Sequence, residues 1–220
     1  MRRGFEDLHI HSSYSDGASS IEEIVQRAAT LKLQTIAITD HFWPSSGSQK
    51  GGTNLIEQRR HEIEISRDNH PELTILDGAE VDIQSNGDVA PVAGGLEQFD
   101  LVIGSFHWHI DSARWASALV KALRRKEFQI LGHWDGYLSS YREEDGWITA
   151  EALADAEVAI ELSGRYSVVH VSFLELAKSF GCMFSLGSDS HHASTVGSLN
   201  FQEKLASSLN LDIWETNRKE

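Results

Sequence analysis

Cysteine is almost absent from this chain, since Cys182 is the only one among 220 residues. A single cysteine excludes a disulfide framework and a cysteine-based zinc finger. Its neighbours in Gly181-Cys182-Met183-Phe184 are small or apolar, which indicates a core position rather than a catalytic thiol. Low-complexity tracts are also missing, and the 40% hydrophobic and 24% charged residues are typical of a globular protein. We expect one domain over residues 1–220.

Long apolar runs are missing as well. No segment reaches the ~18 consecutive apolar residues of a membrane span, and Met1–Asp7 contains no apolar signal core. We therefore expect a cytoplasmic protein with no membrane partner.

Basic residues are few: 19 Lys and Arg stand against 33 Asp and Glu, for a net charge of −14. A nucleic-acid-binding surface needs a basic stripe, so this balance argues against nucleic acid as a partner. Bound cations could offset part of the acidity, because several divalent ions would carry about +4 to +6. The oligomeric state is not indicated by any of these features.

Seven short apolar runs alternate with amphipathic segments along the chain, which predicts βα units and a parallel sheet. Candidate functional residues follow nearly every run, which favours a closed barrel over an open sheet with one crevice. Seven repeats instead of eight predict an α/β fold, a distorted (β/α)7 barrel. The predicted strands are Phe5–His9, Thr35–Thr39, Leu73–Ala79, Leu101–Ser105, Gln129–Leu131, Val158–Leu162 and Met183–Leu186. The predicted helices are Ile21–Leu31, capped by Ser19 or Ser20, then Asn54–Asp68, Ala113–Lys126, Thr149–Ala156, Val168–Phe180 and Gln202–Ser208.

One stretch, Pro44–Thr53, is rich in glycine and serine and comes too early in the chain for a domain boundary. We expect it to form a mobile loop over the mouth of the barrel.

Six histidines stand at the ends of predicted strands. His9 and His11 alternate with Leu8 and Ile10, so they share one face of a strand end with Asp7. Residues two apart on a strand are separated by about 6.6 Å, which lets two imidazoles converge on one ion. Any one such histidine is as often a hydrogen-bonded core residue, but six in matching contexts predict one metal site built from five directions. The six are His9, His11, His41, His107, His133 and His191.

Two carboxylates join these histidines. Asp189 and His191 repeat the two-residue spacing at the last strand, and Glu80 closes an apolar run at the third strand end. The alternative for Glu80 is a solvated loop residue. A carboxylate can bridge two ions held ~3.5–4 Å apart with a shared hydroxide as nucleophile, an arrangement suited to attack at phosphorus. The metal itself is left open, because such ligands accept Mn, Fe and Zn alike.

In this pattern the chain resembles the PHP (polymerase and histidinol phosphatase) superfamily of metal-dependent phosphoesterases. The resemblance extends from Asp7 to about Gly197. Each motif is short and weak alone, yet all occur in the family's order. They are His9-Ile10-His11 with the following Ser12–Gly17, then Thr39-Asp40-His41, Gly78–Ile83, Ser105-Phe106-His107, His133 and Ser188–His191.

The resemblance implies a (β/α)7 barrel with two or three divalent metal ions. By motif, His9, His11, Glu80 and Asp189 would hold the first ion. Glu80, His107 and His133 would hold the second, and Asp16, His41 and His191 the third. Glu80, His107 and Asp189 would be the catalytic residues.

Three positions depart from the family's pattern. Some relatives have a histidine at the position of Gly17, and many have a proline at the position of Trp134. The third ion and one wall of the pocket are therefore where this chain differs. Arg165 resembles a phosphate-binding arginine of histidinol-phosphatase-like members, although those usually carry asparagine where this chain has Ser163. The alternative for Arg165 is a solvated loop residue.

Three functions remain open at this point. The first is hydrolysis of a small phosphate monoester through a metal-bridging hydroxide, with a small phosphorylated molecule as substrate. The second is a phosphodiesterase or 3′-exonuclease acting on nucleotides, which the acidic balance of the chain disfavours. The third is a non-catalytic metal-binding scaffold, which the nearly complete set of implied ligands disfavours.

Overall fold

Seven strands pair in chain order, each parallel to the next, in the computed structural model, which describes residues 6–42 and 51–216. The first and last strands meet at their carboxyl ends, where Ile10 and Ser190 form a parallel bridge and the His11 amide donates to the Ser190 carbonyl at 2.8 Å. The sheet is therefore a nearly closed barrel, as predicted. The strands are β1 (Glu6–Ile10), β2 (Thr35–Ile38), β3 (Thr74–Asp82), β4 (Leu101–Ser105), β5 (Ile130–Leu131), β6 (Ala159–Ser163) and β7 (Phe184–Gly187).

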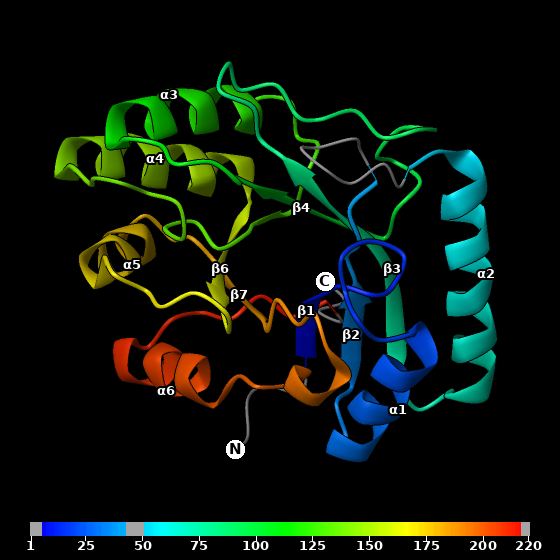
Figure 1. Ribbon diagram of the computed structural model, residues 1–220. Coiled ribbons are helices and arrows are strands. Elements are labelled where there is room, and N and C mark those ends of the chain that lie inside the picture. Colours follow the sequence, from blue (N-terminus) through cyan, green and yellow to red (C-terminus); the bar gives the residue numbers. More distant parts are fainter. Residues whose placement is uncertain (1–5, 43–50, 217–220) are drawn as a thin grey trace.

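Helices cover the outside of this barrel (Figure 1). Within the described ranges none of them is both long and apolar enough to cross a bilayer. The connection between β3 and β4, residues 83–100, has no helix and contains only an antiparallel bridge from Ile83 to Val89. This missing helix makes the barrel irregular. The helices are α1 (Ile21–Leu31), α2 (Thr53–Asn69), α3 (Ser112–Leu123), α4 (Glu143–Ala156), α5 (Val171–Ser179) and α6 (Asn200–Leu209), with a 3₁₀ turn at Ala193–Thr195.

Helix α1 forms where its local sequence predicts. Ser20 is the cap: its hydroxyl accepts from the Glu23 amide while the Glu23 carboxylate accepts from the Ser20 amide. Ile21 and Ile24 lie on the buried face, since apolar residues three and four apart share one side of a helix. The cap and the periodicity together confirm this helix.

Strand β3 is longer than predicted, which corrects the position of Glu80. The strand runs to Asp82, so Glu80 lies inside it rather than at its end. Val81 is fully buried, and the Ile83 amide donates to the Ser105 carbonyl at 2.7 Å, so pairing with β4 continues beyond the apolar run. Glu80 still faces the barrel interior, with 1% of its surface exposed.

Three helix ends differ from the prediction by three residues or more. α5 begins at Val171 rather than Val168, because the amides of Val169 and His170 donate to the Asp135 carboxylate. α4 begins at Glu143 rather than Thr149, because three acidic residues in its first turn favour the positive end of the helix dipole. α3 ends at Leu123 rather than Lys126, whose backbone has a φ of 55° and cannot continue the helix. The predicted loop Pro44–Thr53 lies largely outside the described residues, which exclude positions 43–50.

Helix α2 contributes an arginine, Arg59, that is completely buried. Its Nε donates to Asp40 Oδ2 at 2.7 Å, and its Nη2 donates to the Gly78 carbonyl at 2.7 Å. The same guanidinium also bonds the Asp77 carboxylate and the Ile38 carbonyl. Arg59 therefore joins α2 to the ends of β2 and to β3.

Asp40 connects Arg59 to the loop after β1. Its Oδ1 accepts from the Ser12 amide at 2.7 Å and from the Ser15 hydroxyl at 2.6 Å. Burial raises the pKa of the Asp40 carboxyl, but the charge of Arg59 outweighs that effect and keeps the pKa below its usual range. The ion pair is thus a buried anchor for two loops at the same end of the barrel.

Replacing Arg59 tests this anchor. Arg59→Ala would leave buried carboxylates without a partner, so we expect the free energy of unfolding to fall by about 3–5 kcal/mol. Arg60→Ala is the matched control, because Arg60 is 30% exposed and shares the Asp77 carboxylate at 2.7 Å; its loss should be about 1 kcal/mol or less. Urea denaturation measures both values, and equal losses would contradict the anchoring role.

Cys182 is buried in the core, as predicted, and its Sγ donates to the Ala150 carbonyl at 3.3 Å. Burial raises the pKa of the thiol to about 11. At pH 8, below that pKa, only about one thiol in a thousand is then ionised, and thiolate is the reactive form. We expect native protein to react with a disulfide reagent far more slowly than protein in 6 M guanidinium. Similar rates in the two states would contradict the burial.

Candidate metal centre

The carboxyl end of the barrel brings together every residue that the sequence analysis assigns to a site. Three of the residues come from β1 and the loop after it, one from β3, one each from the segments after β2, β4, β5 and β6, and two from the segment after β7. The residues, in chain order, are His9, His11, Asp16, His41, Glu80, His107, His133, Arg165, Asp189 and His191.

Glu80 is the centre of this cluster, because imidazoles from four directions face its carboxylate. On one side, Oε2 lies 3.1 Å from His9 Nε2, 3.3 Å from His11 Nε2 and 3.4 Å from His41 Nε2. On the other side, Oε1 lies 3.0 Å from His133 Nε2 and 3.3 Å from His107 Nε2. One buried carboxylate thus stands between two groups of nitrogen atoms.

A second group forms around Asp189, two residues after the end of β7. Asp189 Oδ1 lies 3.4 Å from both His11 Nε2 and His191 Nδ1. His191 Nε2 in turn lies 3.0 Å from Asp16 Oδ2, and His11 Nδ1 lies 3.5 Å from Asp16 Oδ1. Among the described residues, four sets of three side chains each bring one ligand atom per residue to within 4.8 Å of the other two: His9/His11/Glu80, His11/Asp16/His41, His11/Asp189/His191 and His41/Glu80/His107.

Bonds on the outer side of the imidazoles fix which nitrogen faces inward. His9 Nδ1 donates to Glu161 Oε1 at 2.7 Å, and His107 Nδ1 donates to Asp82 Oδ1 at 2.5 Å. An imidazole that donates from Nδ1 keeps a lone pair on Nε2 when it is neutral. The Nε2 atoms of His9 and His107 therefore point at the carboxylate oxygens of Glu80, and a positive charge, either a proton or a metal ion, must lie between each nitrogen and the carboxylate.

The charges of the cluster agree with that requirement. Burial raises the pKa of the Glu80 carboxyl, but His9 and His107 outweigh it and hold this pKa well below its usual range. Burial lowers the pKa of His11 and His107, yet the carboxylates around them raise these values to about 9 and about 10. Burial raises the pKa of Asp189, but His9 and His11 bring it down to about 2. Nitrogen and oxygen donors around buried negative charge are a set that divalent transition metals bind.

Two carboxylates of this arrangement, Glu161 and Asp82, are absent from the residues assigned by sequence. Glu161 interrupts the apolar strand Ala-Ile-Glu-Leu and is 1% exposed. A charged residue inside a buried strand is rare unless it is paired, so the sequence of this strand alone indicates that Glu161 has a partner. Asp82 offers a weaker one, because it follows Glu80 at the two-residue spacing that places both on one face of β3.

One wall of the site is aromatic. The ring of Tyr166 lies 4.8 Å from that of His133, and the Tyr166 and Tyr137 hydroxyls are 3.1 Å apart. Beside this wall, Arg165 Nη1 lies 2.6 Å from His191 Nδ1 and 3.8 Å from Asp189 Oδ1. Arg165 thus stands at the edge of the cluster.

Arg165 also borders a cavity of about 320 Å³, which lies between the segment after β6 and the start of α6. A second arginine, Arg142, which precedes α4, does not line this cavity and pairs with Asp145 through two bonds, at 2.7 and 2.9 Å. The cavity and the cluster thus share one residue, Arg165. The lining residues of the cavity are Gly164, Arg165, Tyr166, Ser167, Ser198, Asn200, Phe201 and Gln202.

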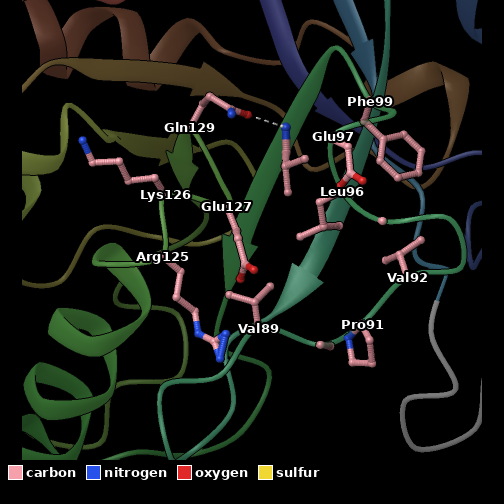
Figure 2. A pocket seen from close by; sticks show the side chains of 13 residues that line it. Val89, Pro91, Val92, Leu96, Glu97, Phe99, Arg125, Lys126, Glu127 and Gln129 are labelled. Carbon is pink, nitrogen blue, oxygen red and sulfur yellow. Dashed lines mark hydrogen bonds between the residues drawn. The ribbon is translucent and has the colours of Figure 1, made fainter.

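A larger cavity, of about 670 Å³, lies at the opposite end of the strands (Figure 2). Val102, at the start of β4, and Gln129, just before β5, are on its wall, and the Val102 amide donates to Gln129 Oε1 at 2.8 Å. Glu127 and Val89 are also part of the lining. None of the ten residues of the cluster lines this cavity, so the larger cavity is separate from the candidate metal centre.

Comparisons with known proteins agree with this geometry. The chain is 28% identical over 193 residues to the DNA polymerase/3′-5′ exonuclease PolX of Bacillus subtilis, a match that covers 84% of this chain and 34% of the polymerase. The chain thus spans about a third of that relative's length. A probable phosphatase of Pectobacterium carotovorum is 26% identical over 223 residues, covering 93% of this chain and 85% of the phosphatase.

Among solved structures, histidinol phosphate phosphatase from Lactococcus lactis, complexed with Zn, L-histidinol and phosphate, superimposes with a TM-score of 0.72. The two chains are 19% identical, and the match covers 94% of each. This likeness confirms the fold. The model of the PHP domain matches residues 7–168, a range that includes Glu80 and five of the six strand-end histidines. The chain therefore belongs to the PHP domain family.

Proposed function

We propose that this protein is a metal-dependent phosphoesterase that hydrolyses a small phosphate monoester. The observation that carries the proposal is the buried Glu80 carboxylate, which faces imidazole nitrogens on two sides at 3.0–3.4 Å. Donors of this kind around one bridging carboxylate suit two neighbouring divalent ions. The probable phosphatases among the relatives, and the structural relative solved with Zn and phosphate, support the same activity.

We assign the ligands by motif and position. His9, His11, Glu80 and Asp189 would hold a first ion, and Glu80, His107 and His133 a second. Asp16, His41 and His191 would hold a third, and the contact of His191 with Asp16 at 3.0 Å supports this last group. Zn is the metal named for the structural relative, and Mn and Fe suit the same donors.

The residues of the chain have separate tasks in the proposed reaction. When bound, the ions would activate a water molecule and withdraw charge from the phosphoryl oxygens. We assign Glu80, His107 and Asp189 as the catalytic residues, because they would hold the positive charge of the ions beside the reacting phosphorus. Arg165 would bind a phosphoryl oxygen through its guanidinium, which matches phosphate geometry. The rings of Tyr137 and Tyr166 cover His133, which is 4% exposed, on one side.

The size of the site and the charge of the chain favour a small substrate. The cavity next to Arg165 has a volume of about 320 Å³, within the range of small-molecule sites. The net charge of −14 disfavours a polynucleotide. A phosphodiesterase or exonuclease and a non-catalytic metal scaffold are the competing functions, and the following assay separates all three.

Metal stripping and reloading tests the activity. Protein stripped with a chelator and reloaded with Mn, Fe or Zn should release phosphate from a panel of monoesters that includes histidinol phosphate and nucleotides. His9→Ala and Asp189→Ala should each lower kcat/KM by at least about 100-fold, since even loss of a residue behind a ligand costs 10- to 100-fold. His61→Ala, exposed on α2, is the matched control and should have no effect.

The other outcomes have distinct meanings. Cleavage of bis-p-nitrophenyl phosphate or of an oligonucleotide, without monoester turnover, would identify a diesterase. Metal binding without turnover of either class would identify a scaffold.

Arg165 provides a separate test of phosphate recognition. Arg165→Ala should lower kcat/KM by about 10- to 100-fold, mainly through a higher KM, because a hydrogen bond to a charged group contributes about 1.5–3 kcal/mol. Arg165→Lys should keep part of this binding, since it retains the charge without the fork. Arg142→Ala is the matched control because Arg142 is paired with Asp145. Equal effects at Arg165 and Arg142 would contradict a role in phosphate binding.

A further inference from the structure

Glu161 lies in the middle of β6, 1% exposed, and both of its carboxylate oxygens accept a short hydrogen bond from another strand's segment. Oε1 accepts from His9 Nδ1 at 2.7 Å, and Oε2 accepts from the backbone amide of His133 at 2.6 Å. Through one side chain β6 is therefore connected to residues from β1 and from the end of β5.

The surrounding backbone is shaped to admit this carboxylate. At Gly187 on β7, an added Cβ would lie 2.1 Å from Glu161 Oε1 and 2.6 Å from the Cβ of His9. Only glycine leaves room there for Glu161 to reach His9. His133 has a φ of 23°, outside the regions that L-residues prefer, and the bond from its amide to Glu161 holds it in that conformation.

We propose that Glu161 is a positioning residue that sets the metal-binding form of two ligands at once. It keeps the proton of His9 on Nδ1, so that Nε2 presents a lone pair to the ion, and it holds the backbone of His133 so that its ring reaches Glu80. The inference rests on the proposed function, in which His9 and His133 bind different ions. Glu161 itself touches neither ion nor substrate in this assignment.

Glu161→Gln separates this role from simple filling of space, because the amide has the same shape but only one acceptor oxygen. The backbone amide of His133 can only donate, so the amide oxygen must face it. The NH₂ group then faces His9 Nδ1, which becomes an acceptor and moves its proton to Nε2. That tautomer directs an N–H at the ion.

The matched control is Asp135→Asn. Asp135 is 7% exposed, lies two residues after His133, and accepts from the amides of Val169 and His170 through Oδ2 alone. One amide oxygen can replace that oxygen. Asp135→Asn thus removes a nearby buried charge without altering a ligand contact. Glu161→Asp is a second variant, which keeps the charge but withdraws the carboxylate by one methylene.

The experiment measures zinc affinity by competition with a chromogenic chelator, together with ¹H–¹⁵N spectra of zinc-loaded protein labelled at histidine. We expect Glu161→Gln and Glu161→Asp to bind zinc about 10- to 100-fold more weakly than the wild type. The downfield Nδ1 proton signal of His9 should shift upfield or disappear in both. Asp135→Asn should change neither quantity.

Each contrary result has its own meaning. If both Glu161 variants bind zinc as tightly as Asp135→Asn and keep the His9 signal, the positioning role is wrong, even if they unfold more easily. If the wild type binds no zinc, the proposed function fails and the inference fails with it. His9→Ala distinguishes these cases, because it should weaken zinc binding whenever the proposed centre exists.

Discussion

The buried carboxylate of Glu80 determines which groups must surround it in this barrel. Glu80 is 1% exposed, and an ionised carboxylate in such a place is costly unless cationic or hydrogen-bonding groups surround it. No single helix or hairpin can bring nitrogen atoms to a carboxylate from every side. A barrel of parallel strands can, because the carboxyl ends of all its strands converge on one mouth. The irregular closure between β1 and β7 completes the ring of donors.

Charge alternates outward from this carboxylate. Around it stand imidazoles, and behind two of them stand further carboxylates, Glu161 behind His9 and Asp82 behind His107. At the periphery, Arg59 neutralises Asp40, which in turn holds the loop after β1. Each of these outer groups orients the group to which it is hydrogen-bonded: Glu161 orients His9, Asp82 orients His107, and Asp40 orients the loop after β1. The same alternation explains how a strongly acidic chain can bury so many carboxylates in one region.

Much of this arrangement could be predicted from the sequence, because apolar runs end where histidines begin. The seven strands, α1 with its Ser20 cap, and the convergence of the histidines all follow from local patterns. The apolar run before Glu80 predicts a strand end at this residue, but pairing with β4 extends β3 to Asp82. The partners of Arg59 and Glu161 could not be predicted, since only the folded chain brings them together. Glu161 and His9 are 152 residues apart.

The closure between the first and last strands has a consequence for how the protein is made. The Ser188 amide donates to Asp7 Oδ1 at 2.7 Å across 181 positions of sequence, and Asp189 lies next to that junction. A nascent chain on the ribosome therefore carries its first histidines long before the residues that complete their surroundings emerge. Loop-closure entropy makes such distant contacts late events in folding. The cluster around Glu80 can be complete only after β7 and the segment that holds Asp189 and His191 have been synthesised, so a prematurely terminated chain would lack part of the donor set.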